Sequence, residues 1–350
     1  MKCIYWLLLP LLFIACKDQN KSVSLTATIG SGQMPALTKD SKNTIHLVYG
    51  IGDSIMYSSS ADEGASFNTP VLVGTLTNLV DFATRGPQIA ATKNGVTIIA
   101  VNQQGDIFSY IKDPSGKWTN TGRVNDIDTI NKEGFLGLSS DGNNTLFAIW
   151  PDLRNDNHNK IYGTKSTDGG QTWHKNQPVY ASPDSTVCEC CRPSVIMHAQ
   201  HVFVMFRNFL QGNRDLYLIE SADAGATFGA AQKLGNGNWQ LDGCPMDGGG
   251  LSMATQNIQT VWRRKDSIFS AIPGNAEQFV SIGKGCTVAA KENIIVYAWV
   301  NDGKIFYKKN DSAVQTIGNG NSPVLQIIDE KNFICAWTDS GIIKYRLMNL

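Results

Sequence analysis

The stretch Ser166-Thr-Asp-Gly-Gly-Gln-Thr-Trp173 decides the fold, because its pattern occurs three times in the chain. The other two copies are Ser60-Ala-Asp-Glu-Gly-Ala-Ser-Phe67 and Ser221-Ala-Asp-Ala-Gly-Ala-Thr-Phe228. Each copy follows a strand-like stretch and precedes another short apolar segment. Asp, Gly and Ser or Thr in this order favour a hairpin turn held by side-chain-to-backbone hydrogen bonds, with the aromatic ring packed on the sheet. A turn that recurs at one place in a repeat indicates a repetitive all-β fold.

Strand patterns outside these turns complete the repeat. A short innermost strand starts near Pro35, Pro87, Phe135, Pro193, Gly250, Cys286 and Pro323. A strongly apolar second strand follows each of them, at Ile45–Tyr49, Val96–Val101, Thr145–Trp150, Val202–Phe206, Ile258–Trp262, Ile294–Val300 and Phe333–Trp337. We predict that residues 23–350 form a single β-propeller of seven blades, each with up to four antiparallel strands. Six blades are the fallback, because the fifth and sixth repeats are short.

The two ends of this region complement each other. Val23–Ile29 alternates apolar and polar residues at a period of two, which is typical of a half-buried strand. The last repeat ends with Ile342–Met348, its third strand, and lacks a fourth. We predict that the N-terminal strand completes the last blade and closes the ring, which removes the exposed edges of an open array.

The three turns resemble the Asp boxes of the sialidase and BNR-repeat superfamily. Asp62, Asp168, Trp173 and Asp223 match the structural positions of that motif. The resemblance implies a sialidase-like propeller with a glycan-directed function. That function would be carbohydrate binding, or the activity of a divergent glycoside hydrolase or lyase.

The resemblance also implies a catalytic set, which this chain carries only in part. Family sialidases bind the sugar carboxylate with three arginines, and the position of the first reads Gln33-Met34-Pro35 here. Their nucleophile is a tyrosine, and the late entry loops of this chain contain none. We therefore expect no ordinary sialidase activity. The remaining candidates for a catalytic acid are Asp53, Glu133, Asp152 and Asp247.

Two sets of loops open onto one face of such a propeller, around its central channel. They are the loops that enter each innermost strand and the loops between second and third strands. Candidate ligand-binding residues on these loops are Arg85, Arg154, Arg192, Arg207, Arg263 and Asp242. Because guanidinium groups bind carboxylates in a bidentate manner, we expect a glycan or small anionic ligand at this mouth. The alternative is a set of solvated rim loops whose ion pairs contribute little.

Five cysteines precede or begin the innermost strands of three consecutive blades. They are Cys188, Cys190 and Cys191 in the fourth blade, Cys244 in the fifth and Cys286 in the sixth. We predict that they converge at the channel mouth, either as disulfides between neighbouring entry loops or as a thiolate site for Cu or Zn. The second possibility defines an alternative function, a noncatalytic propeller whose cysteine-lined mouth holds a metal or a partner protein.

The first residues suggest export. Lys2 is followed by the apolar run Ile4–Ala15, which is too short to span a bilayer and is typical of a signal peptide over residues 1–15. Ala15-Cys16 resembles a bacterial lipobox, so we expect a lipid on Cys16 and a polar tether over residues 16–22. The alternative is an ordinary cleaved signal with a chance cysteine. We therefore predict a lipoprotein of the bacterial cell envelope, on the periplasmic side or at the outer membrane or surface.

Charge and composition narrow the partners. The chain has 350 residues with 30 basic and 30 acidic side chains, and hence no formal net charge. No basic stripe interleaves with aromatic residues, which argues against nucleic acid. We expect a monomer that contacts a membrane only through its lipid.

Overall fold

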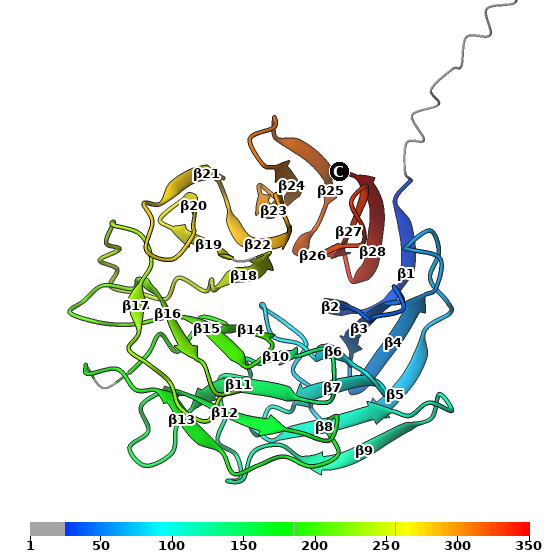
Figure 1. Cartoon of the computed structure of the whole chain (residues 1–350), viewed down its shortest axis with the longest axis horizontal. Helices are drawn as coiled ribbons and strands as arrows, with labels where there is room; N and C mark the ends of the chain where they lie inside the picture. Colours follow the sequence, from blue (N-terminus) through cyan, green and yellow to red (C-terminus); the bar gives the residue numbers. More distant parts are fainter. Residues whose placement is uncertain (1–24, 185, 256) are drawn as a thin grey trace, which may run out of the picture.

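The computed structural model describes residues 25–184, 186–255 and 257–350, and this part of the chain contains strands but no helix. The strands form seven sheets of four, in which neighbouring strands are antiparallel. Figure 1 shows these sheets as blades arranged around a central axis. The chain is therefore a seven-bladed β-propeller, and the predicted fold class is confirmed with seven blades rather than six.

Each of the first six blades consists of four consecutive strands, counted outward from the axis. The first blade consists of β2 (Gln33–Lys39), β3 (Ile45–Ile51), β4 (Ser54–Ser60) and β5 (Val71–Thr75). The second consists of β6 (Gln88–Thr92), β7 (Gly95–Val101), β8 (Ile107–Lys112) and β9 (Trp118–Arg123). The third consists of β10 (Gly137–Ser140), β11 (Leu146–Asp152), β12 (Lys160–Ser166) and β13 (Gln177–Tyr180). The fourth blade consists of β14 (Ser194–His198), β15 (His201–Arg207), β16 (Leu216–Ser221) and β17 (Gln232–Lys233). The fifth consists of β18 (Gly249–Ala254), β19 (Asn257–Arg264), β20 (Ser267–Ala271) and β21 (Gln278–Ile282). The sixth consists of β22 (Lys284–Lys291), β23 (Ile294–Asn301), β24 (Lys304–Lys309) and β25 (Gln315–Asn319).

The seventh blade joins the two ends of the chain. It consists of β26 (Asn321–Ile327), β27 (Asn332–Asp339), β28 (Ile342–Asn349) and, outermost, β1 (Ala27–Ser31). Ala27 pairs with Tyr345 and Ser31 with Ile342. The predicted closure by the N-terminal strand is confirmed, although the strand begins at Ala27. Leu25 lies before it with 83% of its surface exposed, and Val23 lies outside the described residues.

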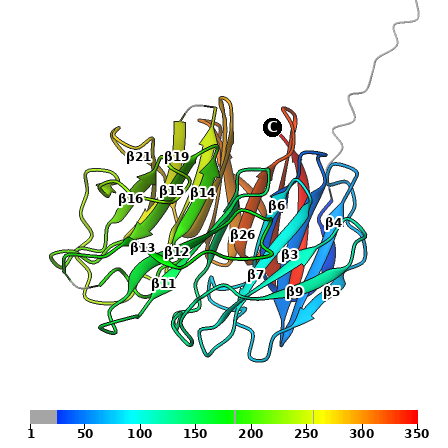
Figure 2. The same ribbon diagram turned by 60° about the horizontal axis from the view of Figure 1, so that its bottom comes forward.

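The second strand of each blade forms most of the core. β7 and β11 are buried along nearly their whole length, because both faces of these strands are covered by neighbouring blades. This explains why they are continuous apolar runs rather than alternating patterns. The innermost strands contact one another in order around the axis, from β2 through β26 and back to β2. In the view of Figure 2, the blades extend between two faces that carry the connecting loops.

The three repeated turns have the same hydrogen bonds. In the turn after β12, Asp168 Oδ1 accepts a hydrogen bond from the Thr172 N–H at 2.9 Å, and its Oδ2 accepts one from the Thr172 hydroxyl at 2.6 Å. Ser166 Oγ accepts the Gly170 N–H at 2.9 Å. The equivalent bonds occur after β4, around Asp62, and after β16, around Asp223. Each turn thus links the third and fourth strands of its blade.

These turns also fasten each blade to the one before it. The Thr97 hydroxyl of the second blade donates to Gly169 O in the third at 2.7 Å. The Phe228 ring of the fourth blade lies 5.7 Å from the Phe147 ring of the third, measured between centroids. The sequence pattern predicts that the aromatic ring packs on its own blade. The structure places the ring against the preceding blade, because the turn bends back over the gap between the two sheets.

Nothing in the described residues is a helix long and apolar enough to cross a membrane. The predicted signal peptide, the lipid attachment at Cys16 and the tether over residues 16–22 lie outside the described residues.

Candidate functional site

A cavity of about 430 Å³ opens where the innermost strands begin, at the end of the channel that the sequence predicts to carry the site. Its walls include Gln33, Met34, Met246 and Pro323, and its charged lining residues are Arg192, Asp247, Arg263 and Lys284. These residues come from the entry segments of different blades and from the end of β19. The cavity falls within the size range of small-molecule sites.

The loops between second and third strands differ in length around this mouth. In the sixth and seventh blades they are tight hairpins, with positive φ angles at Asp302 and Gly303 and at Ser340 and Gly341. Such left-handed pairs suit two-residue turns. In the third and fourth blades, residues 153–159 and 208–215 form longer loops. The cavity is lined mainly by blades with short connections.

Asp247 is the only carboxylate among the described residues that line the cavity. It is buried, its Oδ2 accepts the Gly285 N–H at 3.1 Å, and Arg263 Nη1 lies 3.8 Å from the same oxygen. Burial raises the pKa of this carboxyl above its usual value, while the charges of Arg207 and Arg263 oppose the change. Asp247 is therefore a buried carboxylate that lies close to the positive charges of Arg207 and Arg263.

Arg192 differs from every other arginine proposed for the mouth. It lines the cavity and is half-buried, yet its guanidinium forms no hydrogen bond or ion pair within the described part of the chain. Burial lowers the pKa of this group, and the nearby charge of Asp247 opposes that change. A desolvated guanidinium with free donors is suited to bind an anion that enters the cavity.

Arg207 lies behind the cavity wall and is only 2% exposed. Its Nε donates to Asp247 O at 3.2 Å, Nη1 to Arg214 O at 2.7 Å and Nη2 to Arg263 O at 2.9 Å. The guanidinium also lies over the ring of Trp239, 5.0 Å from its centroid. Each of its nitrogens already donates to a carbonyl, so Arg207 organises the loops of the fourth and fifth blades and does not reach a ligand.

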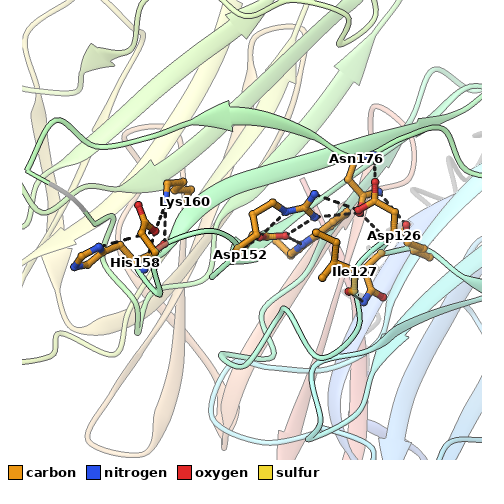
Figure 3. A network of polar contacts seen from close by, with 11 residues as sticks. Asp126, Ile127, Asp152, His158, Lys160 and Asn176 are labelled. Carbon is orange, nitrogen blue, oxygen red and sulfur yellow. Dashed lines mark hydrogen bonds and ion pairs between the residues drawn. The ribbon is translucent and has the colours of Figure 1, made fainter.

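Arg154 and Asp152 bind each other, away from the cavity lining. Arg154 Nε and Nη2 each donate to a carboxylate oxygen of Asp152 at 2.8 Å, and Trp150 Nε1 donates to Asp152 Oδ2 at 2.9 Å. Arg154 also reaches Asp126 at 3.1 Å, and the network continues to Asn176 (Figure 3). The paired charges satisfy one another, and they join the second blade to the third.

Arg85 and Glu133 form a second internal pair. Arg85 Nη2 lies 3.8 Å from Glu133 Oε2, and the guanidinium packs 4.0 Å from the centroid of the Phe135 ring. Burial raises the pKa of Glu133, and the Arg85 charge opposes this. Neither side chain lines the cavity, although the neighbouring residues Ala83 and Thr84 do.

The remaining acidic candidates lie outside the cavity lining. Asp53 is exposed between β3 and β4, where its Oδ1 accepts the Asn78 N–H at 2.8 Å and its backbone oxygen accepts the Leu76 N–H. It therefore holds a loop in place. Asp242 is exposed on the loop before β18. The mouth thus brings together Arg192, Arg263 and Asp247 from the predicted set.

A disulfide joins Cys190 to Cys244 between the entry loops of the fourth and fifth blades, with Cα atoms 6.2 Å apart. Cys188 Sγ lies 3.0 Å from Cys191 Sγ and 3.7 Å from Cys190 Sγ, and all three residues are buried. The Cys191 thiol hydrogen bond and the charges of Arg207 and Arg214 lower the pKa of Cys188 to about 7, against the effect of burial. Cys286 is a buried thiol in the cavity wall, outside this sulfur group.

Sequence reasoning missed one residue that shapes the mouth. The buried Trp239 lies beneath both Arg207 and Arg263, whose guanidinium carbons are 5.0 and 5.5 Å from its ring centroid. Its signal is a lone tryptophan in the polar, glycine-rich stretch Gly235–Gln240. A large aromatic residue in such a loop indicates a packing role, and here it supports two cations.

No family model matches the chain, and no curated protein matches its sequence. Among solved structures it is similar to the BP39L lectin from Burkholderia pseudomallei, with a TM-score of 0.62, 10% identity and coverage of 90% of this chain and 96% of that one. It is also similar to the GH93 alpha-L-arabinofuranosidase of Fusarium graminearum, with a TM-score of 0.54, 12% identity and coverage of 91% and 93%.

A third similar structure is a mutant of the Aleuria aurantia lectin in complex with Fucalpha1-6GlcNAc, with a TM-score of 0.54, 10% identity and coverage of 85% and 98%. At these identities the likeness shows a shared propeller fold. Function has to be argued from the site.

Proposed function

We propose that this propeller is a glycan-binding protein that takes an acidic sugar in its mouth cavity. The observation that carries the proposal is Arg192, a half-buried guanidinium in the cavity wall with no partner among the described residues. A sugar carboxylate would supply the two acceptor oxygens that a guanidinium binds side by side.

The charge of the cavity supports an anionic ligand. Arg192, Arg263 and Lys284 are basic, whereas Asp247 is the one acidic residue of the described lining. Arg263 is turned partly toward Asp247, at 3.8 Å, and toward Asp266. Arg192 and the exposed Lys284 therefore remain for a ligand. The structural neighbours that are lectins or a glycosidase favour a sugar over other anions as the ligand class.

The carboxylates favour binding over hydrolysis. Most glycoside hydrolases use a pair of carboxylates about 5–9.5 Å apart. Here Asp247 has no second carboxylate beside it in the described lining, and Asp152 is bound by Arg154. The position that holds an arginine in sialidases is occupied by Gln33, which lines the same cavity. We therefore propose a carbohydrate-binding protein rather than a sialidase.

Two finer inferences accompany this proposal. We infer that the turns around Asp62, Asp168 and Asp223 are Asp boxes, because all three have the same serine, aspartate and glycine hydrogen bonds. The sequence around Cys16 favours an exported lipoprotein of the bacterial cell envelope. Such a location would place the mouth among the glycans of the cell envelope or of its surroundings.

An array of glycans with and without carboxylates tests the proposal. We expect binding to acidic glycans, weakened by about tenfold or more in Arg192→Ala, since hydrogen bonds to charged groups contribute about 1.5–3 kcal/mol. Arg192→Lys should recover part of the affinity. Lys175→Ala removes an exposed cation from the turn after β12 and serves as the matched control. Equal binding of neutral and acidic glycans, or unchanged affinity in Arg192→Ala, would contradict the proposal.

A further inference from the structure

Four sulfur atoms meet beside the mouth, and the glycan site uses none of them. The Sγ atoms of Cys188, Cys190 and Cys191 all lie within 4.8 Å of one another, and all three residues are buried. Cys190 is bonded to Cys244 of the next blade, so the fourth sulfur is adjacent. A disulfide that joins two loops requires only two cysteines. The buried thiols of Cys188 and Cys191 are therefore not needed for that bond.

We propose that Cys188, Cys190, Cys191 and Cys244 form a binding site for a thiophilic d¹⁰ cation, Zn(II) or Cu(I), which is opened by reduction of the Cys190–Cys244 bond. Thiolates are the ligands that these ions prefer over hard cations. The site would link the entry loops of the fourth and fifth blades through a metal in place of a disulfide.

The spacing of the sulfurs fits such an ion. Metal–sulfur bonds of about 2.3 Å place tetrahedral ligands about 3.8 Å apart. The distance from Cys188 Sγ to Cys190 Sγ is 3.7 Å, and that from Cys188 Sγ to Cys191 Sγ is 3.0 Å. Only small movements are needed for three sulfurs to face one point. Cys244 joins them once its bond to Cys190 opens.

The surroundings provide charge for a thiolate cluster. Arg214 Nη1 donates to Cys188 Sγ at 3.3 Å, and the buried Arg207 adjoins Cys188, whose N–H donates to Arg207 O at 3.0 Å. Four thiolates and a divalent ion carry two negative charges, which these two guanidinium groups balance. Arg214 Nε is moreover a buried donor without a partner among the described residues. The Arg214 Nη1 hydrogen bond to Cys188 Sγ is the kind of outer-shell contact that orients metal ligands.

The redox step balances with a dithiol reductant. Two electrons and two protons convert the Cys190–Cys244 disulfide into two thiols, and the dithiol becomes a disulfide. Each thiol then releases its proton to solvent when its sulfur binds the metal. Cys244 is exposed, so a reductant can reach the bond from solvent.

Metal titration of the reduced protein tests the site. The protein is reduced anaerobically with a dithiol, freed of it, and titrated with Co(II) as a spectroscopic probe, then with Zn(II) and Cu(I). We expect one ion per chain and sulfur-to-cobalt charge-transfer absorption that Zn(II) abolishes. Cys188→Ser and Cys191→Ser should lose this absorption. Cys286→Ala, which removes a buried thiol outside the group, should keep it. Unreduced protein should show none.

A second measurement does not depend on the folding of buried variants. In reduced wild-type protein, Zn(II) should slow alkylation of the exposed Cys244. Cys244→Ser should weaken Zn(II) binding by more than about 10–100-fold, which is what loss of an outer-shell partner costs. Reduced protein without thiolate-to-cobalt absorption, an alkylation rate unaffected by Zn(II), or equal loss of absorption in Cys286→Ala would overturn the proposal. So would re-formation of the Cys190–Cys244 disulfide in the presence of the metal.

Discussion

The ring of Phe67 in the first blade packs edge-on against the ring of Tyr345 in the last, with centroids 4.7 Å apart. Phe67 ends the first of the three repeated turns, and Tyr345 lies in β28, opposite Ala27 of β1. The Tyr345 hydroxyl also donates to Ala65 O at 3.3 Å. The same turn that fastens neighbouring blades elsewhere thus fastens the two ends of the propeller to each other.

A double-mutant cycle measures this closure. We expect Phe67→Ala and Tyr345→Ala to lower the free energy of unfolding, with a coupling of about 0.5–1.5 kcal/mol from the aromatic pair. Denaturant unfolding of the two single variants and the double variant gives the value. Phe279→Ala, which removes an exposed ring from β21, is the control. Strictly additive effects of Phe67 and Tyr345 would show that the contact contributes nothing to closure.

The Asp168 turn should matter for stability and not for ligand binding. Asp168→Ala removes the acceptor of the Thr172 N–H and hydroxyl, and we expect a loss of about 1–2 kcal/mol. Trp173→Ala should also destabilise the fold, because its ring packs on the core between the second and third blades. Neither turn residue lines the mouth cavity. Reduced glycan affinity at an unchanged melting temperature would show that this turn belongs to a site.

The same turns predict a pH dependence. Hydrogen bonds from Ser66 and Ser60 lower the pKa of Asp62 to about 2, and those from Thr227 and Ser221 lower the pKa of Asp223. A carboxyl with a lowered pKa in the folded state stabilises the fold above its ordinary pKa, near 3.8, and loses that contribution as the pH falls toward 2. The stability difference between wild type and Asp62→Asn should therefore shrink between pH 4 and pH 2.

Urea unfolding at several pH values gives this difference. Asp242→Asn, an exposed carboxylate on the loop before β18, is the matched control and should stay close to wild type throughout. A difference between wild type and Asp62→Asn that persists unchanged at pH 2 would mean that the carboxylate charge is not what holds the turn.

Ordinary sialidase activity should be absent or very low. Gln33 lacks the charge and the paired donors of an arginine, and no tyrosine lines the described mouth cavity. Release of a fluorophore from a simple sialic-acid glycoside measures this, with a true sialidase as the positive control. Turnover comparable to that of the control would require a nucleophile that this site does not show.

The fold could be predicted because its signals are local. Each second strand is a buried apolar run, and three turns share one pattern within eight residues. The site was harder to predict. Arg192 lies on the expected entry loop, whereas Arg207 is the last residue of β15 rather than part of the loop that follows it, and its role depends on the carbonyls that surround it. Asp247 O, Arg214 O and Arg263 O converge on Arg207 from separate segments, and no local pattern indicates that convergence.

The same reasoning applies to Arg154 and to the cysteines. Asp152 precedes Arg154 by two residues, but the network also needs Asp126 from an earlier blade. Topology predicts that entry-loop cysteines approach one another, because innermost strands are neighbours around the axis. The choice of Cys190 over Cys188 or Cys191 as the partner of Cys244 depends on how the loop folds, which is a tertiary property.

The contrast between Arg207 and Arg192 gives the last prediction. Arg207→Met should leave three carbonyls without their donor in a buried site, and each unsatisfied group costs about 1–3 kcal/mol. We therefore expect a large drop in melting temperature. Arg192→Met removes a guanidinium that bonds no described residue, and should leave the melting temperature nearly unchanged while weakening the binding of acidic glycans. Scanning calorimetry of both variants gives their melting temperatures, and titration calorimetry with an acidic glycan gives their affinities. Equal destabilisation by the two substitutions would mean that Arg192 is also part of the scaffold and is not free to bind a ligand.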